Sequence, residues 1–157
     1  MRDLEQVRVY GARAALLMEE VSTAAGVPSV NLEAAPTVGG RADWSAKTVV
    51  QVTARELPEV VAVLHGWRHE FEALYHGPAK NRGYRFRHEP DGAFTVAVFD
   101  PRGRRAVRVG LGERLGMATL ALRRLALSYP GVTLWQLHTT LRGLCFPACL
   151  ADRPSGD

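Results

Sequence analysis

A short stretch of the chain carries a large share of its basic side chains. Between residues 80 and 108 there are eight lysines and arginines and only three acidic residues, a local charge of +5 against +4 for the whole chain. Arginine dominates, since 18 of the 20 basic residues are arginine. A guanidinium group offers a planar fork to phosphate and a flat face to a base, so this stretch favours contact with nucleic acid. Codon usage in a GC-rich genome is the competing explanation.

The segment GYRFRHE alternates aromatic and basic side chains. Alternate residues of a strand lie on opposite faces, so Tyr84 and Phe86 share one face and Arg85 and Arg87 share the other. The same alternation in RRAVRVGL places Arg108 on the side away from the core. We therefore expect the three arginines on one solvent-facing sheet surface that could follow a phosphate backbone while nearby aromatics stack on bases. An ordinary polar sheet face is the alternative.

The loop HGPAKNRG combines small residues with hydrogen-bond donors. Lys80, Asn81 and Arg82 are suited to the phosphates or base edges of a nucleic-acid strand. As a motif, this loop has low specificity.

Other side chains that could do chemistry do not form a recognisable catalytic or metal site. His65 and His69 have ligand spacing, but Gly66 is expected to end the helix between them and no third ligand is evident. Cys145 and Cys149 lack the C-x-x-C spacing of redox and zinc motifs. Nucleophile, phosphate-loop and dinucleotide motifs do not occur in the sequence. We expect no metal, no cofactor and no enzymatic activity.

Length and composition indicate one domain with its own core. The chain has 157 residues, 46% of them hydrophobic, a sequence pI near 9.5 and two cysteines. The basic balance suits an anionic partner, and the lack of a disulfide framework indicates a reducing compartment, the bacterial cytoplasm. The N-terminus shows no signal peptide or membrane span. We expect a domain over residues 1–150 and a polar tail over 151–157.

The first half of the chain is predicted to be strands followed by a helix. Thr53 and Glu56 have the spacing of a capping box, and Gly66 is placed to end the helix that they begin. On that helix, Leu57, Val60 and Leu64 fall on one face together with the adjacent Val61. The segments expected before it are a strand at 7–18 in which Gly11 could form a bend, strands at 29–34 and 47–53, and a loop at 36–45.

The second half repeats this order. Four strands with short turns at Gly77-Pro78, Asp91-Gly92 and Pro101–Gly103 predict an antiparallel meander between residues 70 and 111. A helix is predicted over 113–128 with an apolar face comprising Leu115, Ala118, Leu122, Leu125 and Ala126. A further amphipathic segment with Trp135 suggests a docking or oligomerisation helix. The repeated order suggests an internal duplication.

Several of these segments resemble the Whirly proteins, single-stranded-DNA-binding proteins of plant organelles. The motif Ala42-Asp43-Trp44-Ser45-Ala46-Lys47 is similar to a Whirly Trp-Ser-x-Lys entrance to a strand and helix, and FEALYHGPAK is similar to a Whirly Phe-Phe-His-x-Pro-x-Lys loop. The segment around Ala12 and Arg13 resembles the family's Lys-Gly-Lys-Ala-Ala-Leu strand, without the first lysine. The likeness covers roughly residues 7–135 in short islands. Between Val21 and Trp44 the chain is shorter than Whirly proteins.

The resemblance implies an α+β fold with two antiparallel sheets from a duplicated strands-then-helix unit and C-terminal helices. It also implies a homotetramer that binds single-stranded DNA along and between neighbouring sheets with little sequence preference. Trypanosome mitochondrial RNA-binding proteins share that fold, so an RNA-binding or RNA-annealing module is an alternative, and a protein-interaction scaffold is another. The residues expected to contact nucleic acid are Arg13, Trp44, Lys47, Tyr75, His76, Lys80, Asn81, Arg82, Tyr84, Arg85, Arg87 and Arg108.

Overall fold

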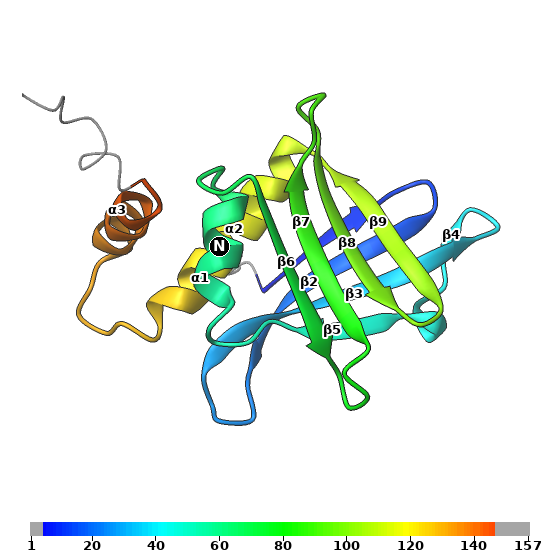
Figure 1. Cartoon of the computed structure of the whole chain (residues 1–157), viewed down its shortest axis with the longest axis horizontal. Coiled ribbons are helices and arrows are strands. Elements are labelled where there is room, and N and C mark those ends of the chain that lie inside the picture. The colour runs from blue at the N-terminus through cyan, green and yellow to red at the C-terminus, as the bar shows by residue number, and fades with distance from the viewer. Residues whose placement is uncertain (1–4, 147–157) are drawn as a thin grey trace, which may run out of the picture.

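Two antiparallel sheets cross each other and share one core, and the helices gather at one end of them (Figure 1). The structure is a computed structural model, which describes residues 5–146. Strands and a helix alternate twice along the chain, five strands before α1 and four before α2. The predicted α+β fold with two antiparallel sheets is confirmed.

Sheet 1 contains the first five strands. β3 is its central strand and pairs with β2, β4 and β5, while β1 pairs with β2. The residues that face sheet 2 and the helices are small or β-branched, with Leu16, Met18 and Leu32 the largest. The strands are β1 (Gln6–Tyr10), β2 (Ala14–Ser22), β3 (Pro28–Val38), β4 (Arg41–Ala42) and β5 (Thr48–Gln51).

Three boundaries predicted for sheet 1 are wrong. The single strand expected at 7–18 is a hairpin, because the chain turns at Gly11, whose N–H donates to the carbonyl oxygen of Ala14 at 2.8 Å. Apolar residues continue on both sides of this turn, so alternation alone does not reveal it. The strand expected at 29–34 runs on to Val38, and the expected loop at 36–45 also contains β4 and a 3-10 helix, η1 (Trp44–Ala46).

Sheet 2 is the predicted meander. Its order is β6-β7-β8-β9, and every neighbouring pair is antiparallel. Tyr84 and Phe86 are fully buried on its inner face, as the alternation of GYRFRHE predicts. The strands are β6 (Glu70–His76), β7 (Arg82–His88), β8 (Phe94–Asp100) and β9 (Gly103–Val109).

Three helices, α1 (Leu57–Leu64), α2 (Leu111–Ala126) and α3 (Leu134–Cys145), complete the described fold. The reciprocal bonds of the Thr53–Glu56 capping box are present at 2.9 and 3.3 Å, although regular helix begins only at Leu57. The predicted apolar face of α2 is partly wrong. Leu115 is 67% exposed, and Met117, Leu120 and Ala121 are buried in its place, because α2 packs against both α1 and sheet 1.

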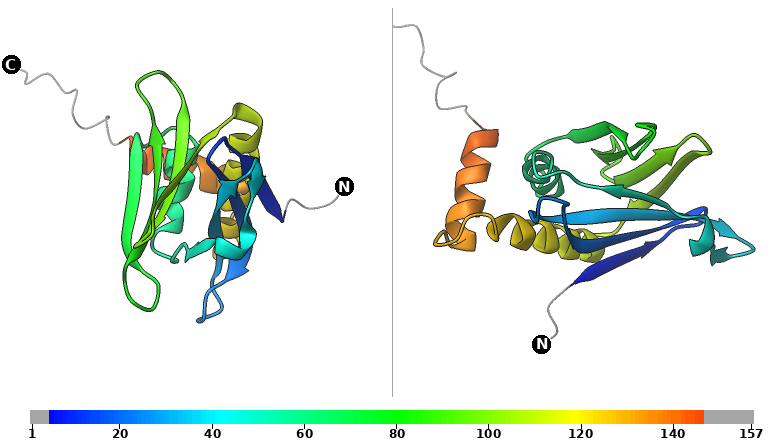
Figure 2. Two further views of the ribbon diagram at one scale, coloured as in Figure 1. Left: turned by 90° about the vertical axis from the view of Figure 1, so that its right-hand side faces the viewer. Right: turned by 90° about the horizontal axis from the view of Figure 1, so that it is seen from below.

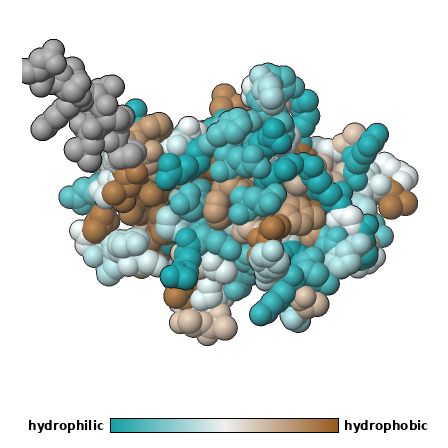
Figure 3. Space-filling model, in the orientation of Figure 1, coloured by the Kyte–Doolittle hydropathy of each residue, from teal (hydrophilic) through white to brown (hydrophobic). Residues whose placement is uncertain are grey.

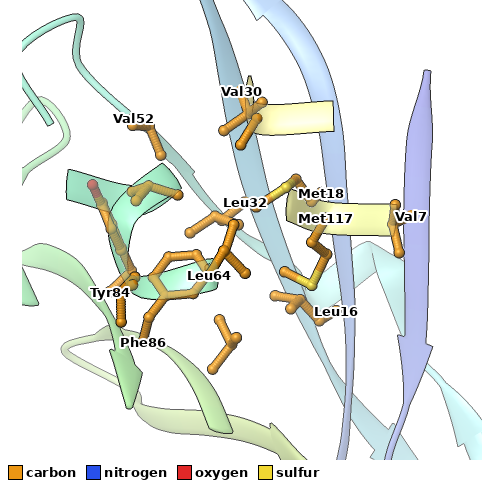
Figure 4. Close-up of a cluster of buried hydrophobic side chains, with 14 of the residues drawn as sticks. Val7, Leu16, Met18, Val30, Leu32, Val52, Leu64, Tyr84, Phe86 and Met117 are labelled. Carbon is orange, nitrogen blue, oxygen red and sulfur yellow. The ribbon is translucent and has the colours of Figure 1, made fainter. Parts of the chain in front are cut away.

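The core lies between the two sheets and reaches α1 and α2. Figure 4 shows Leu16, Met18 and Leu32 of sheet 1 meeting Phe86 of sheet 2 and Met117 of α2. The turns β1–β2, β3–β4 and β8–β9 lie at the end of the molecule opposite α3, as two further views show (Figure 2). No helix within residues 5–146 is long and apolar enough to cross a membrane.

Candidate nucleic-acid interface

The outer face of sheet 2, which points away from the core, carries the arginines that the sequence predicted there. Arg87, Thr95 and Arg108 lie side by side on β7, β8 and β9. Arg85 lies one row further along β7, opposite Ala97. The predicted shared surface for Arg85, Arg87 and Arg108 is therefore present.

Carboxylates accompany each of these arginines. Glu70 lies opposite Arg87 and 3.7 Å from Nε of Arg85, and Glu72 lies opposite Arg85. Further pairs join Arg87 to Glu89 at 3.6 Å and Arg108 to Asp91 at 3.3 Å. Opposite charges on neighbouring strands attract each other, and they reduce the field that a phosphate would meet. Because Glu70 and Glu72 belong to β6, they lie outside the stretch from residue 80 to 108, and including them lowers the local charge to +3.

A second group of charged side chains joins the two sheets. Asp100 at the end of β8 accepts a hydrogen bond from Thr48 Oγ1 of β5 at 2.6 Å, and Arg102 and Arg105 lie 2.7 and 3.6 Å from its carboxylate. Both arginines also donate to Thr48 Oγ1. Burial alone would raise the pKa of Asp100, but the hydrogen bonds from Arg102 and Thr48 and the charge of Arg102 hold it well below its usual range. The carboxylate thus stays ionised and fixes both arginines.

The β6–β7 loop lies beside this group. Arg82 donates to the backbone carbonyl of Val49 at 3.2 Å, so its guanidinium is held against β5. Arg82, Asn81 and Arg102 line an open cavity of about 490 Å³ between the β6–β7 loop and the β8–β9 turn. Lys80 is exposed at the tip of the loop. These donors could bind an anionic group that enters the cavity.

Tyr84 and His76 form an internal network with Glu56. The Tyr84 hydroxyl donates to Glu56 at 2.9 Å, and Nε2 of His76 lies 2.8 Å from the other carboxylate oxygen. Burial and the neighbouring carboxylate raise the pKa of Tyr84 far above its usual value. The Tyr84 side chain is completely buried, so it offers no ring face to a base. His76 anchors the end of β6, while Tyr75 beside it is 77% exposed.

Trp44 and Lys47 lie elsewhere, on the outer face of sheet 1. The Arg8 guanidinium lies over the Trp44 ring, 6.0 Å from its centroid. Lys47 is paired with Glu33 at 2.7 Å. Burial and the adjacent Glu33 raise the pKa of Glu19 in the same shallow groove. The core separates these residues from the outer face of sheet 2, so one protomer does not bring all the predicted contacts together.

Several cations at turns have no carboxylate partner within 4.0 Å among residues 5–146. They are Arg13 between β1 and β2, Arg41 in the β3–β4 hairpin, Lys80 in the β6–β7 loop and Arg104 after the β8–β9 turn. The β1–β2, β3–β4 and β8–β9 turns gather at one end of the molecule, which we call the turn end (Figure 2). Unpaired cations at neighbouring turns add their potentials, so the turn end attracts anions more strongly than the paired rows of sheet 2.

The residues expected from the sequence to contact nucleic acid did not include Arg41, Phe99, Arg102, Arg104 and Arg105, although the last three belong to the basic stretch between residues 80 and 108. Phe99 lies on the outer face of sheet 2, opposite Gly83 and Arg104. For Phe99, the signal in the sequence is the alternation in AFTVAVFD. Side chains two and four residues along a strand from Thr95 lie on the same face as Thr95, and Phe99 is the fourth. The contacts of Arg102 and Arg105 with β5 have no comparable signal, since they join segments more than 50 residues apart.

The opposite end of the molecule is apolar. Trp135 is 73% exposed and Leu144 is 70% exposed on α3, and Leu111 and Leu115 are exposed in the first turns of α2, which leads from the sheets towards α3 (Figure 1). Figure 3 shows a hydrophobic region on the face in view where Figure 1 draws α3. A contiguous apolar surface of this kind is typical of a protein contact. Leu137, on the same helix as Trp135, is buried against the core.

The described residues hold no group of three or more histidine, cysteine, aspartate or glutamate side chains that could bind a metal. His65 belongs to an aromatic cluster, stacked on Trp67 with ring centroids 4.5 Å apart. Cys145 is buried at the end of α3. Cys149 and the tail predicted at 151–157 lie outside the described residues.

No protein-family model matches the sequence, and no curated protein matches it significantly. Among solved structures, the plant transcriptional regulator PBF-2 matches with a TM-score of 0.61 at 19% identity, covering 92% of this chain and 98% of that chain. The MRP1/MRP2 structures from Trypanosoma brucei match with a TM-score of 0.58 at 17% identity, covering 80% and 84% of the two chains. PBF-2 is a Whirly-type regulator, so the predicted Whirly-like fold is confirmed.

Proposed function

We propose that this protein binds single-stranded nucleic acid, DNA in preference to RNA, with little sequence preference and without catalysing a reaction. The observation that carries the proposal is the set of exposed, unpaired cations at the turns, Arg13, Arg41, Lys80 and Arg104. Phosphate contacts supply affinity that is independent of sequence. The fold shared with a plant transcriptional regulator supports the same conclusion.

The contact surface extends from the turn end to the cavity between the β6–β7 loop and the β8–β9 turn. Arg82 and Arg102 line that cavity, and each is held by a bond to sheet 1. Arginines fixed in place lose less side-chain entropy when they bind phosphate. Arg85, Arg87 and Arg108 contribute less in this proposal, because a phosphate has to compete with the glutamates and the aspartate that already pair with them.

The binding form in this proposal is a homotetramer located in the cytoplasm. The exposed side chains of α2 and α3 supply an apolar surface for subunit contacts, at the end of the molecule away from the turns. In an oligomer, the outer face of sheet 1 with Trp44 and Lys47 can adjoin sheet 2 of a neighbour. The predicted contact residues that are far apart in one protomer would then lie along one continuous surface formed by two protomers.

Fluorescence anisotropy with labelled oligonucleotides over a range of salt concentrations tests the proposal. Each lost phosphate contact lowers the slope of log affinity against log salt by about 0.7 for a single strand. Arg13→Glu with Arg104→Glu is expected to weaken binding and reduce the slope. Arg85→Glu with Arg87→Glu is the matched control, with the same change in charge and a smaller effect. An absence of binding at low salt, or an affinity indifferent to salt, would refute the proposal.

RNA is the second candidate, because the same cations and exposed aromatics serve either sugar. The likeness to MRP1/MRP2 and the resemblance to trypanosome RNA-binding proteins favour it. Competition between DNA and RNA strands of the same sequence distinguishes the two ligands, since contacts to the 2′-hydroxyl would favour RNA. Equal competition would indicate recognition through phosphates and base faces alone.

A further inference from the structure

One row of side chains across the outer face of sheet 2 has no ion pairs. Gly83 of β7 lies opposite Phe99 of β8, and Phe99 lies opposite Arg104 of β9. Arg104 is exposed and has no carboxylate within 4.0 Å in the described part of the chain. The two rows nearest to it hold Arg85 and Arg87 with their glutamates. We call Gly83, Phe99 and Arg104, with Tyr75 of β6, the aromatic row.

Gly83 lets the Phe99 ring lie directly on the backbone of β7. A Cβ at position 83 would overlap ring atom Cε2 of Phe99 and would lie 2.5 Å from the carbonyl oxygen of Ala73. The ring therefore covers the glycine, with no side chain beneath it. Phe99 is half-buried, so part of the ring remains open to solvent. Ring faces that lie open on a sheet are surfaces on which bases stack.

Tyr75 joins this row through an irregularity in β6. The register shifts between Ala73 and His76, which leaves Leu74 and Tyr75 opposite Gly83. Tyr75 has a φ of 65°, in the left-handed region that bulky residues rarely adopt. The contact between Nε2 of the neighbouring His76 and Glu56 at 2.8 Å holds this part of β6 in place, so the chain keeps this conformation while Tyr75 stays 77% exposed. Backbone strain of this kind concentrates at functional sites.

We propose that the aromatic row is a nucleobase site, in which an unpaired base stacks on Phe99 and Arg104 binds the adjoining phosphate. Tyr75 supplies a second aromatic surface at the β6 edge. The site deepens the proposed function and rests on it. If Phe99 only packed on Gly83 to stabilise the sheet, the unpaired Arg104 beside it and the strained, exposed Tyr75 would have no role in that packing. Double-stranded nucleic acid would not fit, because its bases are already stacked.

Anisotropy with a fluorescein-labelled thymidine oligonucleotide tests the stacking. Phe99→Leu keeps an apolar cover over Gly83 but removes the aromatic face, and it is expected to weaken binding roughly 5- to 100-fold at unchanged salt slope. Phe99→Trp is expected to keep wild-type affinity. Arg104→Gln lowers the slope by about 0.7. Thr95→Ala, on the same strand and face, is the control and leaves both quantities unchanged.

An oligonucleotide of the same length with abasic positions separates stacking from phosphate contacts. The wild type is expected to bind it more weakly than the thymidine strand, and Phe99→Leu is expected to cause no additional loss. Photocrosslinking of the wild type to a 5-iodouracil strand, followed by peptide mapping, supplies a readout that needs no variant. Crosslinks at Tyr75 or Phe99 support the site.

The outcomes distinguish this site from the general proposal. If the wild type binds no single strand, the proposed function fails and the site fails with it. If the wild type binds and Phe99→Leu binds equally well, or if all crosslinks map outside the aromatic row, the nucleobase site alone is refuted. Equal thermal unfolding temperatures of Phe99→Leu and the wild type are required before a loss of affinity is assigned to stacking.

Discussion

Pairing with carboxylates divides the arginines of this protein into two groups with different chemistry. Arg85 and Arg87 share glutamates with their neighbours on the sheet, and Arg105 is fixed by Asp100. Arg13 and Arg104 have no carboxylate partner among residues 5–146. A phosphate gains more from an unpaired guanidinium, because an exposed ion pair loses part of its own attraction when a new anion competes for the cation.

Replacement of Gly83 tests the packing under Phe99 at the residue scale. Gly83→Ala places a Cβ 2.5 Å from the Ala73 carbonyl oxygen, so β6 and β7 have to separate. Overpacking of this kind destabilises by about 1–3 kcal/mol, which corresponds to a fall of roughly 2–12 °C in Tm for a chain of this size. Thermal unfolding by circular dichroism measures it.

Gly143→Ala in α3 is the matched control for that substitution. A Cβ at position 143 meets nothing within 4 Å, and alanine is the better helix former. Its stability is expected to equal or exceed that of the wild type. If Gly83→Ala unfolded at the wild-type temperature, Phe99 would not lie on the backbone as described.

At the scale of elements, α3 is attached to the rest of the fold through a small number of contacts. Leu137 is buried in the core, and His138 packs edge-on against Trp67 with ring centroids 4.8 Å apart. Arg68 donates to the carbonyl oxygen of Cys145 at 3.3 Å. An element held by few contacts opens more readily than the core strands, so conditions that disturb this cluster act on α3 first.

Acidification is expected to loosen this attachment through His65. Burial is the main cause that lowers the pKa of His65 below 6.5. The nearby charges of His138 and Arg114 add to it, and together they outweigh the hydrogen bond that Nδ1 donates to the Val61 carbonyl oxygen at 2.7 Å, which by itself raises the pKa. The unfolded chain therefore takes up the proton more readily than the folded one. The stabilisation is fully present above about pH 6.5 and decreases as the pH falls towards the lowered pKa.

Thermal unfolding between pH 7.5 and 5 measures this dependence. His65→Phe is expected to flatten the profile, and His69→Gln, at an exposed position, is expected to keep the wild-type slope. A His65→Phe profile as steep as that of the wild type would show that His65 does not cause the pH dependence.

For the whole molecule, charge and apolar surface lie at opposite ends. The turn end carries unpaired arginines, while Trp135 and Leu144 are exposed on α3 at the other end (Figure 1). This separation allows subunits to associate through helices without covering the cations. Leu111, Leu115 and Leu122 of α2 line one open pocket together with Leu134 of α3, so the apolar surface there is shared by two helices and is larger than a single surface leucine.

The helical surface is expected to hold subunits together. Leu115→Glu with Trp135→Glu places two charges there and is expected to reduce the molar mass in solution from about four times 17.2 kDa to that of a smaller species. Light scattering after size exclusion, with and without single-stranded DNA, measures it. Val38→Glu, which also changes an exposed apolar residue, is the control at the turn end. A wild type that is monomeric under both conditions would contradict the tetramer.

Local sequence patterns were sufficient for the elements whose signals are contained in a few residues. The meander of β6 to β9 follows from period-two alternation and three turn motifs, and the burial of Tyr84 and Phe86 follows from the same alternation. The Thr53–Glu56 capping box is local in the same way. Gly11 was expected to bend one strand and instead lies in a hairpin turn between two, which the pattern does not reveal because apolar residues continue on both of its sides.

The sequence by itself determined the fold class, the meander and the outward position of Arg85, Arg87 and Arg108. Only the tertiary structure decided which cations remain available. Glu70 neutralises arginines that are 15 and 17 residues away along the chain, and Thr48 of the other sheet adds hydrogen bonds to Asp100, Arg102 and Arg105 that tie this group to sheet 1. Alternation places a side chain on a face, but the free charge depends on partners that strand register and sheet packing bring near.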